Sequence, residues 1–412
     1  MTVGTEPRPG RGEGKGEGQS SSRRHNLSAV LHHALAGSTR AELSQLTGLG
    51  RATITSLVAE LLDLGLLDEQ GPANLGRMGR PGSRLGPPAA GACGVGLEIN
   101  VDYLSVVAID LAGRVRYRAR SERDNRTAGP ARVISAGAEM LAGAVSEVGA
   151  DGLVPVGLGV AVPGITDRDG LIREAPNVGW RDVRLLDHAA GSLPPGLPVT
   201  VDNEANLAAV AELHHGHGRG RRDFVVLTGE VGIGAGIVAN SRLFRGAGGG
   251  AGEIGHVPVS TRGPLCGCGN RGCLERLAGQ DAMLSAAGIN PAVLPAEPGQ
   301  PTGVALLVER AAAGDPAALA ALARSGRYLG AGLRIVTTLL APEAVIFSGI
   351  FVALAPWLLK PAAAALHRRS DAGVDLLISS LGPDAAAMGA ATVGLQRVLD
   401  DPESVRRAGR LS

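Results

Sequence analysis

Apolar residues recur at helical spacing in three short segments near the start of the chain. Residues 27–35 carry an apolar stripe at three- and four-residue intervals, and Gly37 follows as a suitable residue to end a helix. Thr39 and Glu42 have the spacing of a capping box at the start of a second, shorter helix. A third amphipathic segment begins at Arg51. This order of helices, with a glycine-containing turn before the last, predicts a helix-turn-helix.

A helix-turn-helix places the N-terminal residues of its last helix against base edges in the major groove of DNA. The same three helices also fit an ordinary three-helix bundle. The segment NLGRMGRPGSRLG favours DNA binding, because its arginines lie in a Gly/Pro-rich stretch that has no acid from Gly71 to Ala92. Arginines in such a wing neutralise phosphates or enter the minor groove. The predicted DNA contacts are Arg51, Thr53, Thr55, Ser56, Arg77 and Arg80.

Beyond a proline-containing joint at residues 87–91, the pattern changes from helices to strands. The stretch GVGLEINVDYLSVVAIDLAGRVRYRA is typical of three adjoining strands, and a similar plan recurs from Phe224 to Gly246. Helix and strand signals follow each of the two stretches. This repeated α/β unit resembles the duplicated lobes of the actin-like, sugar-kinase-like fold, whose ligand lies between the lobes.

Composition narrows the class of protein. The chain has 412 residues, of which 44% are apolar, and a formal net charge of +1. It is long enough for two or three domains, and no overall charge attracts nucleic acid or membrane, so any DNA contact must be local.

Residues 1–22 lack the apolar region of a signal peptide and predict a disordered tail. The apolar run from Ala344 to Leu359 is too short to span a bilayer, and we expect a cytoplasmic protein without a membrane partner.

Three of the four cysteines lie in the segment CGCGNRGCLE. In a reducing compartment such a cluster favours metal binding over disulfides. Cys266, Cys268 and Cys273, with His256 upstream, form a set of three thiolates and one imidazole that suits tetrahedral zinc. Four protein ligands fill the coordination sphere, so we expect a structural ion. Reactive redox thiols are the alternative.

The segment VTVDNEANLAAVAELHHG is typical of a strand that runs into a helix. Asn203 and Glu204 fall at the strand end, where polar side chains commonly face a ligand crevice. Helix capping by Asn203, with Glu204 in the first turn, accounts for the same residues equally well.

Several blocks together resemble the ROK family of repressors, open reading frames and sugar kinases. GEIGHV, followed at this spacing by CGCGNRGCLE, is similar to the family signature. AVPGITDRDGLIREAPNVGW, VDNEANLAAVAE and APEAVIFSGI fit its other blocks in order, and the likeness runs from about Leu27 to Leu399. The family's repressor branch has an N-terminal winged helix-turn-helix that ends in a GRP wing, here Gly79 to Pro81. The implied fold class is α/β, with this head before a two-lobed actin-like (ribonuclease-H-like) domain that holds a structural zinc.

The resemblance also implies a sugar site. Similar proteins hold sugar hydroxyls with the Asn and the acidic residue of the NEAN block, the Glu and His of GEIGH, and the Glu of GCLE. These residues are Asn203, Glu204, Glu253, His256 and Glu275. Carboxylates and an amide are suited to pairs of hydroxyls. With one nitrogen of His256 on zinc, the other is free to face the ligand, so the metal and sugar sites become one unit.

Kinase activity requires a phosphate cradle and a base for the sugar hydroxyl. Family kinases carry Asp-x-Gly-Gly-Thr in the first strand turn, where this chain has EINVDY from Glu98 to Tyr103. Their base is Asp, whereas this chain has Glu204, and base geometry tolerates little displacement. We therefore expect no enzyme but a sugar-responsive DNA-binding transcriptional regulator, a repressor by its resemblance. The alternatives are an ATP-dependent sugar kinase and a regulator without a sugar ligand.

These features divide the chain into parts with different partners. The head is expected to bind double-stranded operator DNA and the cleft a sugar or sugar derivative. Palindromic half-sites require two-fold symmetry, so we expect a homodimer or a higher homo-oligomer. The expected parts are a tail over residues 1–22, a winged helix-turn-helix over 23–88, a first lobe over 92–202 with part of 385–399 packed against it, a second lobe with the zinc and effector site over 203–384, and a tail over 400–412.

Overall fold

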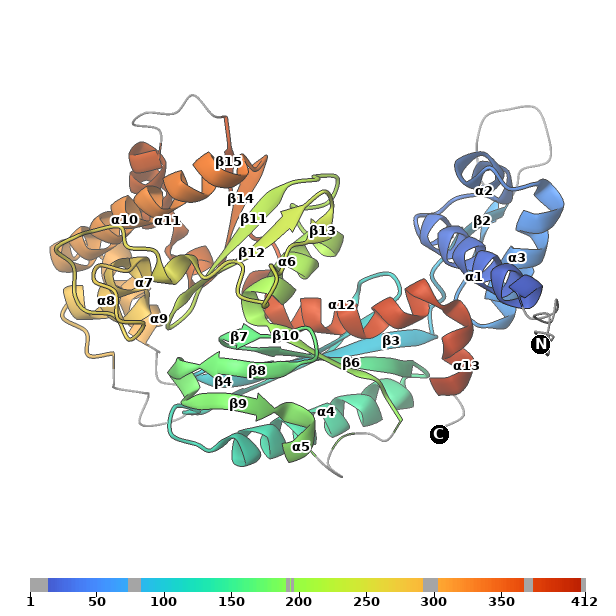
Figure 1. Cartoon of the computed structure of the whole chain (residues 1–412), viewed down its shortest axis with the longest axis horizontal. Helices are drawn as coiled ribbons and strands as arrows, with labels where there is room; N and C mark the ends of the chain where they lie inside the picture. The colour runs from blue at the N-terminus through green and yellow to red at the C-terminus, as the bar shows by residue number, and fades with distance from the viewer. Residues whose placement is uncertain are drawn as a thin grey trace, which may run out of the picture.

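A computed structural model describes residues 14–72, 83–189, 193, 196–291, 303–366 and 373–408. These residues form a small head and two lobes, each lobe with its own five-stranded sheet. Figure 1 shows the head at the right, the first lobe below the centre and the second lobe at the upper left.

The head contains three helices and a two-stranded antiparallel sheet. The predicted capping box is confirmed, because Thr39 Oγ1 accepts the Glu42 amide while the Glu42 carboxylate accepts the Thr39 amide. Leu31, Leu43 and Leu61, one from each helix, are fully buried in one core. The elements are α1 (Gly14–Leu35), α2 (Arg40–Thr47), α3 (Arg51–Asp63), β1 (Asp68–Pro72) and β2 (Ser83–Gly86).

The first helix begins earlier than the sequence pattern predicts. Residues 14–22 belong to α1, so the disordered tail expected over residues 1–22 is wrong for that part, and residues 1–13 lie outside the described residues. These polar residues have no apolar stripe to mark them. The helix continues through them because extending an existing helix fixes one residue for each new backbone hydrogen bond. Arg23 also forms an ion pair with Glu60 of α3.

The first lobe is built on a sheet with the strand order β10-β6-β3-β4-β5. β3, β4 and β5 are antiparallel neighbours, whereas β6 is parallel to β3 and β10 is parallel to β6. A small sheet of β7, β8 and β9 follows β6. The elements are β3 (Ala92–Ile99), β4 (Tyr103–Asp110), β5 (Val115–Glu122), α4 (Pro130–Ala150), β6 (Val154–Val162), β7 (Ile165–Thr166), β8 (Leu171–Ala175), β9 (Trp180–Arg184), α5 (Leu185–His188) and β10 (Val199–Asn203).

The second lobe repeats this plan with the strand order β13-β12-β11-β14-β15. Three strands are again antiparallel, and β14 and β15 continue the sheet in parallel from β11. The two-lobed α/β fold expected from the repeated strand pattern is therefore confirmed. The elements are β11 (Phe224–Gly229), β12 (Ile233–Ala239), β13 (Arg242–Leu243), α7 (Leu274–Ala278), α8 (Gln280–Ala286), α9 (Gly303–Ala312), α10 (Pro316–Leu340), β14 (Ala344–Gly349), α11 (Ile350–Leu366) and β15 (Asp375–Ile378).

Two helices between the sheets join the parts. α12 (Ala385–Asp400) lies on β3 and β6 of the first sheet and also packs against α6 (Glu204–His215). Its contact with the strands is close. A Cβ atom at Gly96 would lie 2.1 Å from the Ala387 carbonyl oxygen, and one at Gly159 would lie 2.0 Å from the Ala390 carbonyl oxygen. Only glycine lets the helix backbone rest directly on the strands.

α6 is enclosed along most of its length, with every residue from Ala205 to Glu212 buried. A Cβ atom at Gly389 of α12 would lie 1.8 Å from the Leu207 carbonyl oxygen, so these two helices also touch through their backbones. At the far end of α6, His215 Nε2 lies 2.9 Å from Thr392 Oγ1. The Thr392 hydroxyl donates to a carbonyl of its own helix, so it accepts from the imidazole, and the proton of neutral His215 sits on Nε2.

The head rests on the same pair of helices. Its core continues into Ala211 of α6 and Leu395 of α12, and Ser28 of α1 donates to the Leu399 carbonyl at 2.7 Å. The tail expected over residues 400–412 is wrong for residues 400–408, which continue α12 and then form two short helices. Contacts with α1 order this segment, and its own sequence gives no sign of them. The short helices are η4 (Pro402–Ser404) and α13 (Val405–Ala408).

One described helix, α4, is long and apolar enough by length and composition to cross a membrane. Its side chains Val133, Leu141 and Val148 are buried in the core of the first lobe. α4 therefore serves as a core helix of this lobe.

The junction at His215 should make the stability of the fold depend on pH. Burial, with the neighbouring charges of His214 and Arg219, lowers the pKa of His215 to about 4. The folded state thus favours the neutral ring. Stability from this group is fully present above the unfolded pKa of about 6.5 and is lost as pH falls from there toward 4.

Chemical denaturation should therefore show a loss of about 1 to 2 kcal/mol through this group between pH 7 and pH 5. His215→Gln should remove that part of the loss. His188→Gln, at an exposed position on α5, should keep it. Equal pH dependence in all three proteins would contradict the assignment.

Candidate effector site and metal centre

The cysteine segment forms a tight loop next to a short helical turn, η2 (Ile254–His256). A β-bridge between Pro258 and Cys273 holds its two arms together. Gly272 turns the chain with φ +69°, and a Cβ atom there would lie 1.8 Å from the Ser260 carbonyl oxygen. Glycine is therefore required at this position, and the close approach brings the sulfur atoms together.

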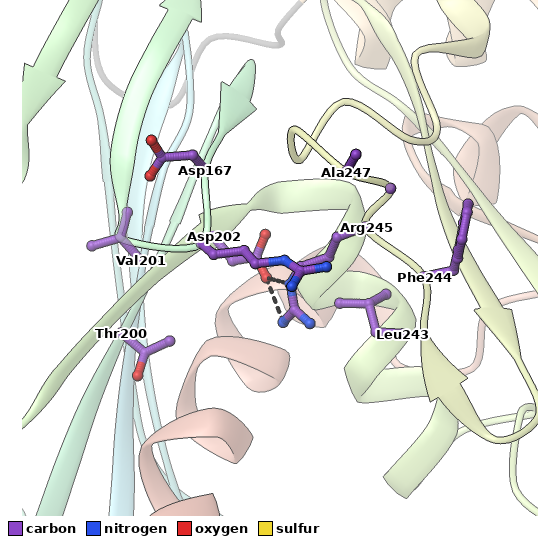
Figure 2. Close-up of a pocket in the computed structure, with 10 residues that line it drawn as sticks. Asp167, Thr200, Val201, Asp202, Leu243, Phe244, Arg245 and Ala247 are labelled. Atoms are coloured by element: carbon purple, nitrogen blue, oxygen red, sulfur yellow. Dashed lines mark hydrogen bonds and ion pairs between the residues drawn. The ribbon is translucent and has the colours of Figure 1, made fainter.

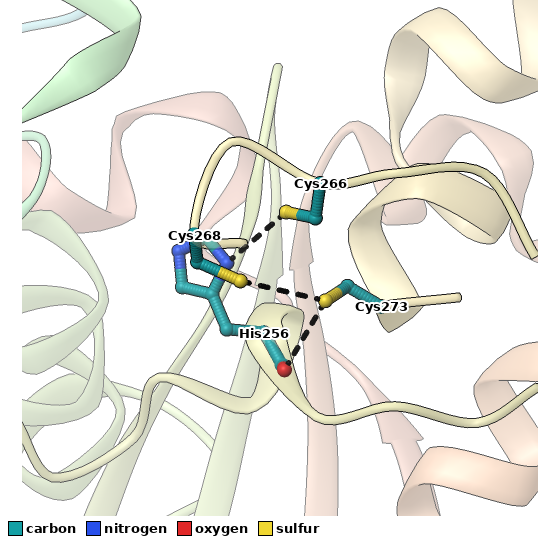
Figure 3. Close-up of side chains that lie close together, drawn as sticks. All are labelled: His256, Cys266, Cys268 and Cys273. Carbon is teal, nitrogen blue, oxygen red and sulfur yellow. Dashed lines mark hydrogen bonds between the residues drawn. The ribbon is translucent and has the colours of Figure 1, made fainter. Parts of the chain in front are cut away.

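His256, Cys266, Cys268 and Cys273 converge, with all four ligand atoms within 4.8 Å of one another (Figure 3). The sulfur atoms of Cys268 and Cys273 are 3.6 Å apart, and Cys266 Sγ lies 3.6 Å from His256 Nδ1. A tetrahedral zinc ion with Zn–S bonds of about 2.3 Å spaces its ligand atoms by about 3.5 to 3.8 Å. The four free side chains therefore fit a tetrahedral metal ion.

The His256 ring connects this centre to two carboxylates. Its Nδ1 faces Cys266 and also lies 3.5 Å from a carboxylate oxygen of Glu275. Its Nε2 lies 3.8 Å from a carboxylate oxygen of Glu253. The structure thus brings three of the predicted effector residues together. With Nδ1 on a metal ion, Nε2 stays available on the Glu253 side.

Asn203 and Glu204 lie where β10 passes into α6. Asn203 Oδ1 accepts two amides of the first helical turn, so the capping role left open by the sequence is present. Its Nδ2 donates to the Gly164 carbonyl and to the Glu204 carboxylate, both at 2.9 Å. Burial raises the pKa of Glu204 well above its ordinary value, and the charge of Glu253 raises it further. Glu204 at the start of α6 and Glu253 of the second lobe are therefore close enough to interact electrostatically.

Asn177 is a residue near Glu275 that sequence reasoning missed. It lies in η1 (Pro176–Val178) of the first lobe. A Cβ atom at Gly232 of the second lobe would lie 3.3 Å from both Asn177 Nδ2 and Glu275 Oε2. An amide of one lobe thus approaches a carboxylate of the other across a glycine. The block APNVGW contains this asparagine, but only the fold places it beside the other lobe.

Side chains fill the first strand turn, where a kinase needs its phosphate cradle. Glu98, Asn100 and Tyr103 are 2%, 4% and 5% exposed. The Tyr103 hydroxyl donates to the Glu98 carboxylate at 2.7 Å, and the Asn100 amide donates to the same oxygen at 3.3 Å. Arg120 of β5 lies 3.5 Å above the Tyr103 ring. These contacts leave no open space in the turn for a phosphate.

A separate cavity of about 650 Å³ lies between β10 and the segment after β13 (Figure 2). None of the predicted effector residues lines it. Within it, Arg245 Nε and Nη2 bind one carboxylate oxygen of Asp202 at 2.8 and 2.7 Å. Asp202 directly precedes Asn203, so this ion pair holds the strand end that carries two of the effector candidates.

The predicted DNA contacts lie only partly in the described residues. Arg51, Thr53, Thr55 and Ser56 are all exposed on the first turns of α3, while Ile54 between them is fully buried. One face of the helix is therefore free for a partner. Arg77, Arg80 and the stretch from Gly79 to Pro81 lie outside the described residues, between β1 and β2.

The two-lobed fold, with a similar five-stranded sheet in each lobe, is that of the sugar-kinase-like class of actin-like proteins. Residues 94–397 match the ROK family. The chain belongs to this family, and the resemblance seen in its sequence motifs is confirmed.

Both repressors and kinases are similar to this chain. The xylose repressor of Bacillus subtilis (strain 168) is 30% identical over 371 residues, which cover 88% of this chain and 92% of the repressor. The crystal structure of a ROK family transcriptional regulator, a homologue of the E. coli MLC protein, has a TM-score of 0.76 at 24% identity and covers 95% of this chain and 100% of that one. A ROK family glucokinase from Streptomyces griseus, in complex with glucose and AMPPNP, has a TM-score of 0.63 at 29% identity and covers 74% of this chain and 99% of that one. The regulators therefore match more of this chain than the glucokinase does.

Loss of one sulfur ligand should weaken metal binding. Cys268→Ser should lower the affinity for zinc by at least about tenfold. Mutation of a residue that only hydrogen-bonds to a metal ligand already lowers metal affinity by about that factor, and loss of a ligand itself should cost at least as much. Metal content per chain, measured by mass spectrometry after dialysis, should fall accordingly. Cys93→Ala, at a buried position outside the centre, should leave it unchanged. A full zinc complement in Cys268→Ser would refute the ligand set.

Proposed function

We propose that this protein is a sugar-responsive, DNA-binding transcriptional repressor that acts in the cytoplasm. The observation that carries the proposal is the combination, in one chain, of a head with an exposed polar helix face and a cleft with carboxylates but a filled phosphate turn. The similarity to a xylose repressor over 88% of this chain supports it.

We assign sugar recognition to residues from both lobes. The carboxylates accept hydrogen bonds from sugar hydroxyls, while the remaining donors bind their oxygens. Loss of one such partner in a dry cleft costs about 1 to 3 kcal/mol, so a few contacts give both affinity and specificity. The assigned residues are Asn203, Glu204, Glu253, His256 and Glu275.

We assign the metal centre to structural zinc. His256 through Nδ1, with the three cysteines of the cluster, completes a tetrahedral set and leaves no position for a reacting water. Bound there, the ion contributes folding energy to the loop. The loop in turn fixes the His256 ring and the neighbouring Glu275.

The proposal does not include phosphoryl transfer. The turn from Glu98 to Tyr103 is buried, and the position of the family's catalytic Asp is held by Glu204. Assays of ATP consumption with a panel of hexoses should therefore show no turnover above background.

We assign operator recognition to the head, working in a homodimer or larger homo-oligomer. In this arrangement α3 enters the major groove, with Arg51 and Thr53 nearest the base edges and Thr55 and Ser56 beside them. Arg77 and Arg80 of the wing contact phosphates or the minor groove. Two heads are required because a single winged module binds weakly and half-sites recur with the helical repeat of DNA.

The proposed mechanism is a population shift. A sugar that binds one arrangement of the lobes more tightly than the other shifts the population toward that arrangement. The affinity for the operator then changes, because the two arrangements bind DNA differently. α6 supports this route, because it begins at Glu204 and ends at His215, which bonds to α12 beside the head. Motion at the cleft is thus transmitted through two packed helices to the DNA-binding surface.

Arg51 provides a test of DNA reading. Arg51→Ala should cost about 1 to 3 kcal/mol on an operator enriched from random duplexes, and less on a scrambled duplex. Fluorescence anisotropy at one fixed salt concentration measures both affinities. Arg181→Ala removes an exposed arginine of the small first-lobe sheet and should change neither. Equal losses on the two duplexes would show that Arg51 contacts only the backbone.

Thr392 provides a test of coupling. Thr392→Val removes the hydroxyl that accepts from His215, and such a hydrogen bond contributes about 0.5 to 1.5 kcal/mol. The ratio of operator Kd values with and without the sugar should therefore shrink by roughly threefold to tenfold. The sugar is first selected by thermal-shift screening. Thr338→Val is the control, since that hydroxyl also bonds its own helix but lies on α10. A ratio unchanged by Thr392→Val would exclude this contact from the mechanism.

A further inference from the structure

Glu230 follows β11 in the second lobe and reaches the first strand turn of the first lobe. Its carboxyl group interacts electrostatically with Glu98 of that turn, and the Asn100 amide in the same turn donates a hydrogen bond to Glu98 at 3.3 Å. Burial raises the pKa of Glu230 to about 8, with the charge of Glu98 as the next cause. Two carboxyl groups from opposite lobes therefore lie close enough for their charges to interact.

Only one of the two oxygens of the Glu98 carboxylate accepts hydrogen bonds. The side chain is 2% exposed, and Oε1 accepts from Tyr103 and Asn100. Its Oε2 is buried and has no hydrogen-bond partner among the described residues. Burial raises the pKa of Glu98, and in the ionised form this oxygen creates a negative potential that solvent does not screen. Glu98 and Glu230 both raise the pKa of Glu204, so this potential extends to the effector residues.

Arg120 and His256, two cationic side chains near these carboxyl groups, are already paired. The Arg120 guanidinium stacks on Tyr103 and donates to Glu122 at 2.6 Å. His256 lies between the carboxylates of Glu253 and Glu275. A zinc ion with three thiolates and one imidazole adds a net charge of about −1. None of these groups offers an unpaired positive charge to an anionic ligand.

We propose that the effector is an unphosphorylated sugar, and that Glu230, together with Asn100 and Glu98, excludes phosphorylated sugars from the cleft. This inference rests on the sugar-binding function proposed above for the same cleft. Two effects act in the same direction. Buried side chains occupy the turn, and a phosphate placed there has to be buried next to carboxyl groups. Neutral hydroxyls avoid this penalty, because carboxylates accept hydrogen bonds from them.

The experiment compares matched pairs of ligands by titration calorimetry: glucose with glucose 6-phosphate, and N-acetylglucosamine with its 6-phosphate. For the parent sugar that binds, the phosphate ester should bind the wild-type protein at least about 100-fold more weakly, as burial of like charges predicts. Glu230→Gln keeps the size of the side chain and removes its charge. At pH 9, where Glu230 with its pKa of about 8 is ionised, the variant should narrow this gap in affinity between ester and parent sugar by about tenfold, and at pH 7, where the carboxyl group is mostly neutral, by much less. The affinity for the parent sugar should change by less than about threefold.

The control is Glu174→Gln, which alters an exposed glutamate of β8 and should leave the gap unchanged. The pH dependence of this difference in affinity is a second measurement. If Glu230 had only a structural role, the variant and the wild type would show the same pH dependence. In the wild type the gap should widen between pH 7 and pH 9, because Glu230 loses its proton near pH 8. In Glu230→Gln the widening should be smaller.

Each outcome decides a separate point. A phosphate ester that binds the wild type as tightly as its parent sugar overturns the inference and leaves the proposed function standing. A wild type that binds no sugar, phosphorylated or not, overturns both. An unchanged gap at pH 9 in a Glu230→Gln variant with the wild-type melting temperature overturns the role given to Glu230.

Discussion

The close contact between α12 and the first sheet is the constraint on which the other parts depend. At Gly96 and Gly159 the helix backbone touches the strands directly, so the helix has no layer of side chains on which to slide. The same helix touches α6 at Gly389 and holds the head through the carbonyl of Leu399. One helix therefore sets the positions of the first lobe, of α6 between the lobes and of the head. A side chain at any of these glycines has to displace α12, and with it the head.

α6 gives this constraint its functional meaning. Asn203 caps the helix and bonds to Glu204, so the first turn is built from residues assigned to sugar binding. The buried middle of the helix cannot deform cheaply, because its small residues are packed between α12 and β12. Its last residue, His215, bonds to Thr392. Asn203 can therefore both cap α6 and take part in ligand binding. A sugar that displaces Glu204 also displaces α6, because the helix moves as a rigid unit.

The sequence predicts those features whose interacting atoms lie within one short segment. The capping box at Thr39 and the convergence of the cysteines are of this kind, and the repeated strand pattern predicts the two lobes. Asn177 and Glu230 escape prediction because their partners belong to the opposite lobe, and no local pattern marks such a pair. The early start of α1 and the order of residues 400–408 depend in the same way on contacts between elements distant in the sequence. The roles of Asn203, Glu253 and Glu275 in ligand binding remain predictions that the fold makes geometrically possible.

A regulator needs only a difference in ligand affinity between two arrangements of its lobes, and the filled phosphate turn is compatible with that need. Glu230 of the second lobe already interacts electrostatically with Glu98 of the first lobe. In the proposed mechanism a sugar contacts residues of both lobes, and Asn177 of the first lobe and Glu275 of the second lie on either side of Gly232. Moving an equilibrium from 1:99 to 99:1 takes about 5.5 kcal/mol of differential affinity. At about 1 to 3 kcal/mol for each buried hydrogen bond gained or lost, two to six hydrogen bonds that a sugar makes only in the closed cleft are sufficient. The hydroxyls of one monosaccharide can form that many, because each hydroxyl both donates and accepts, so no nucleotide is required to drive the change at the head.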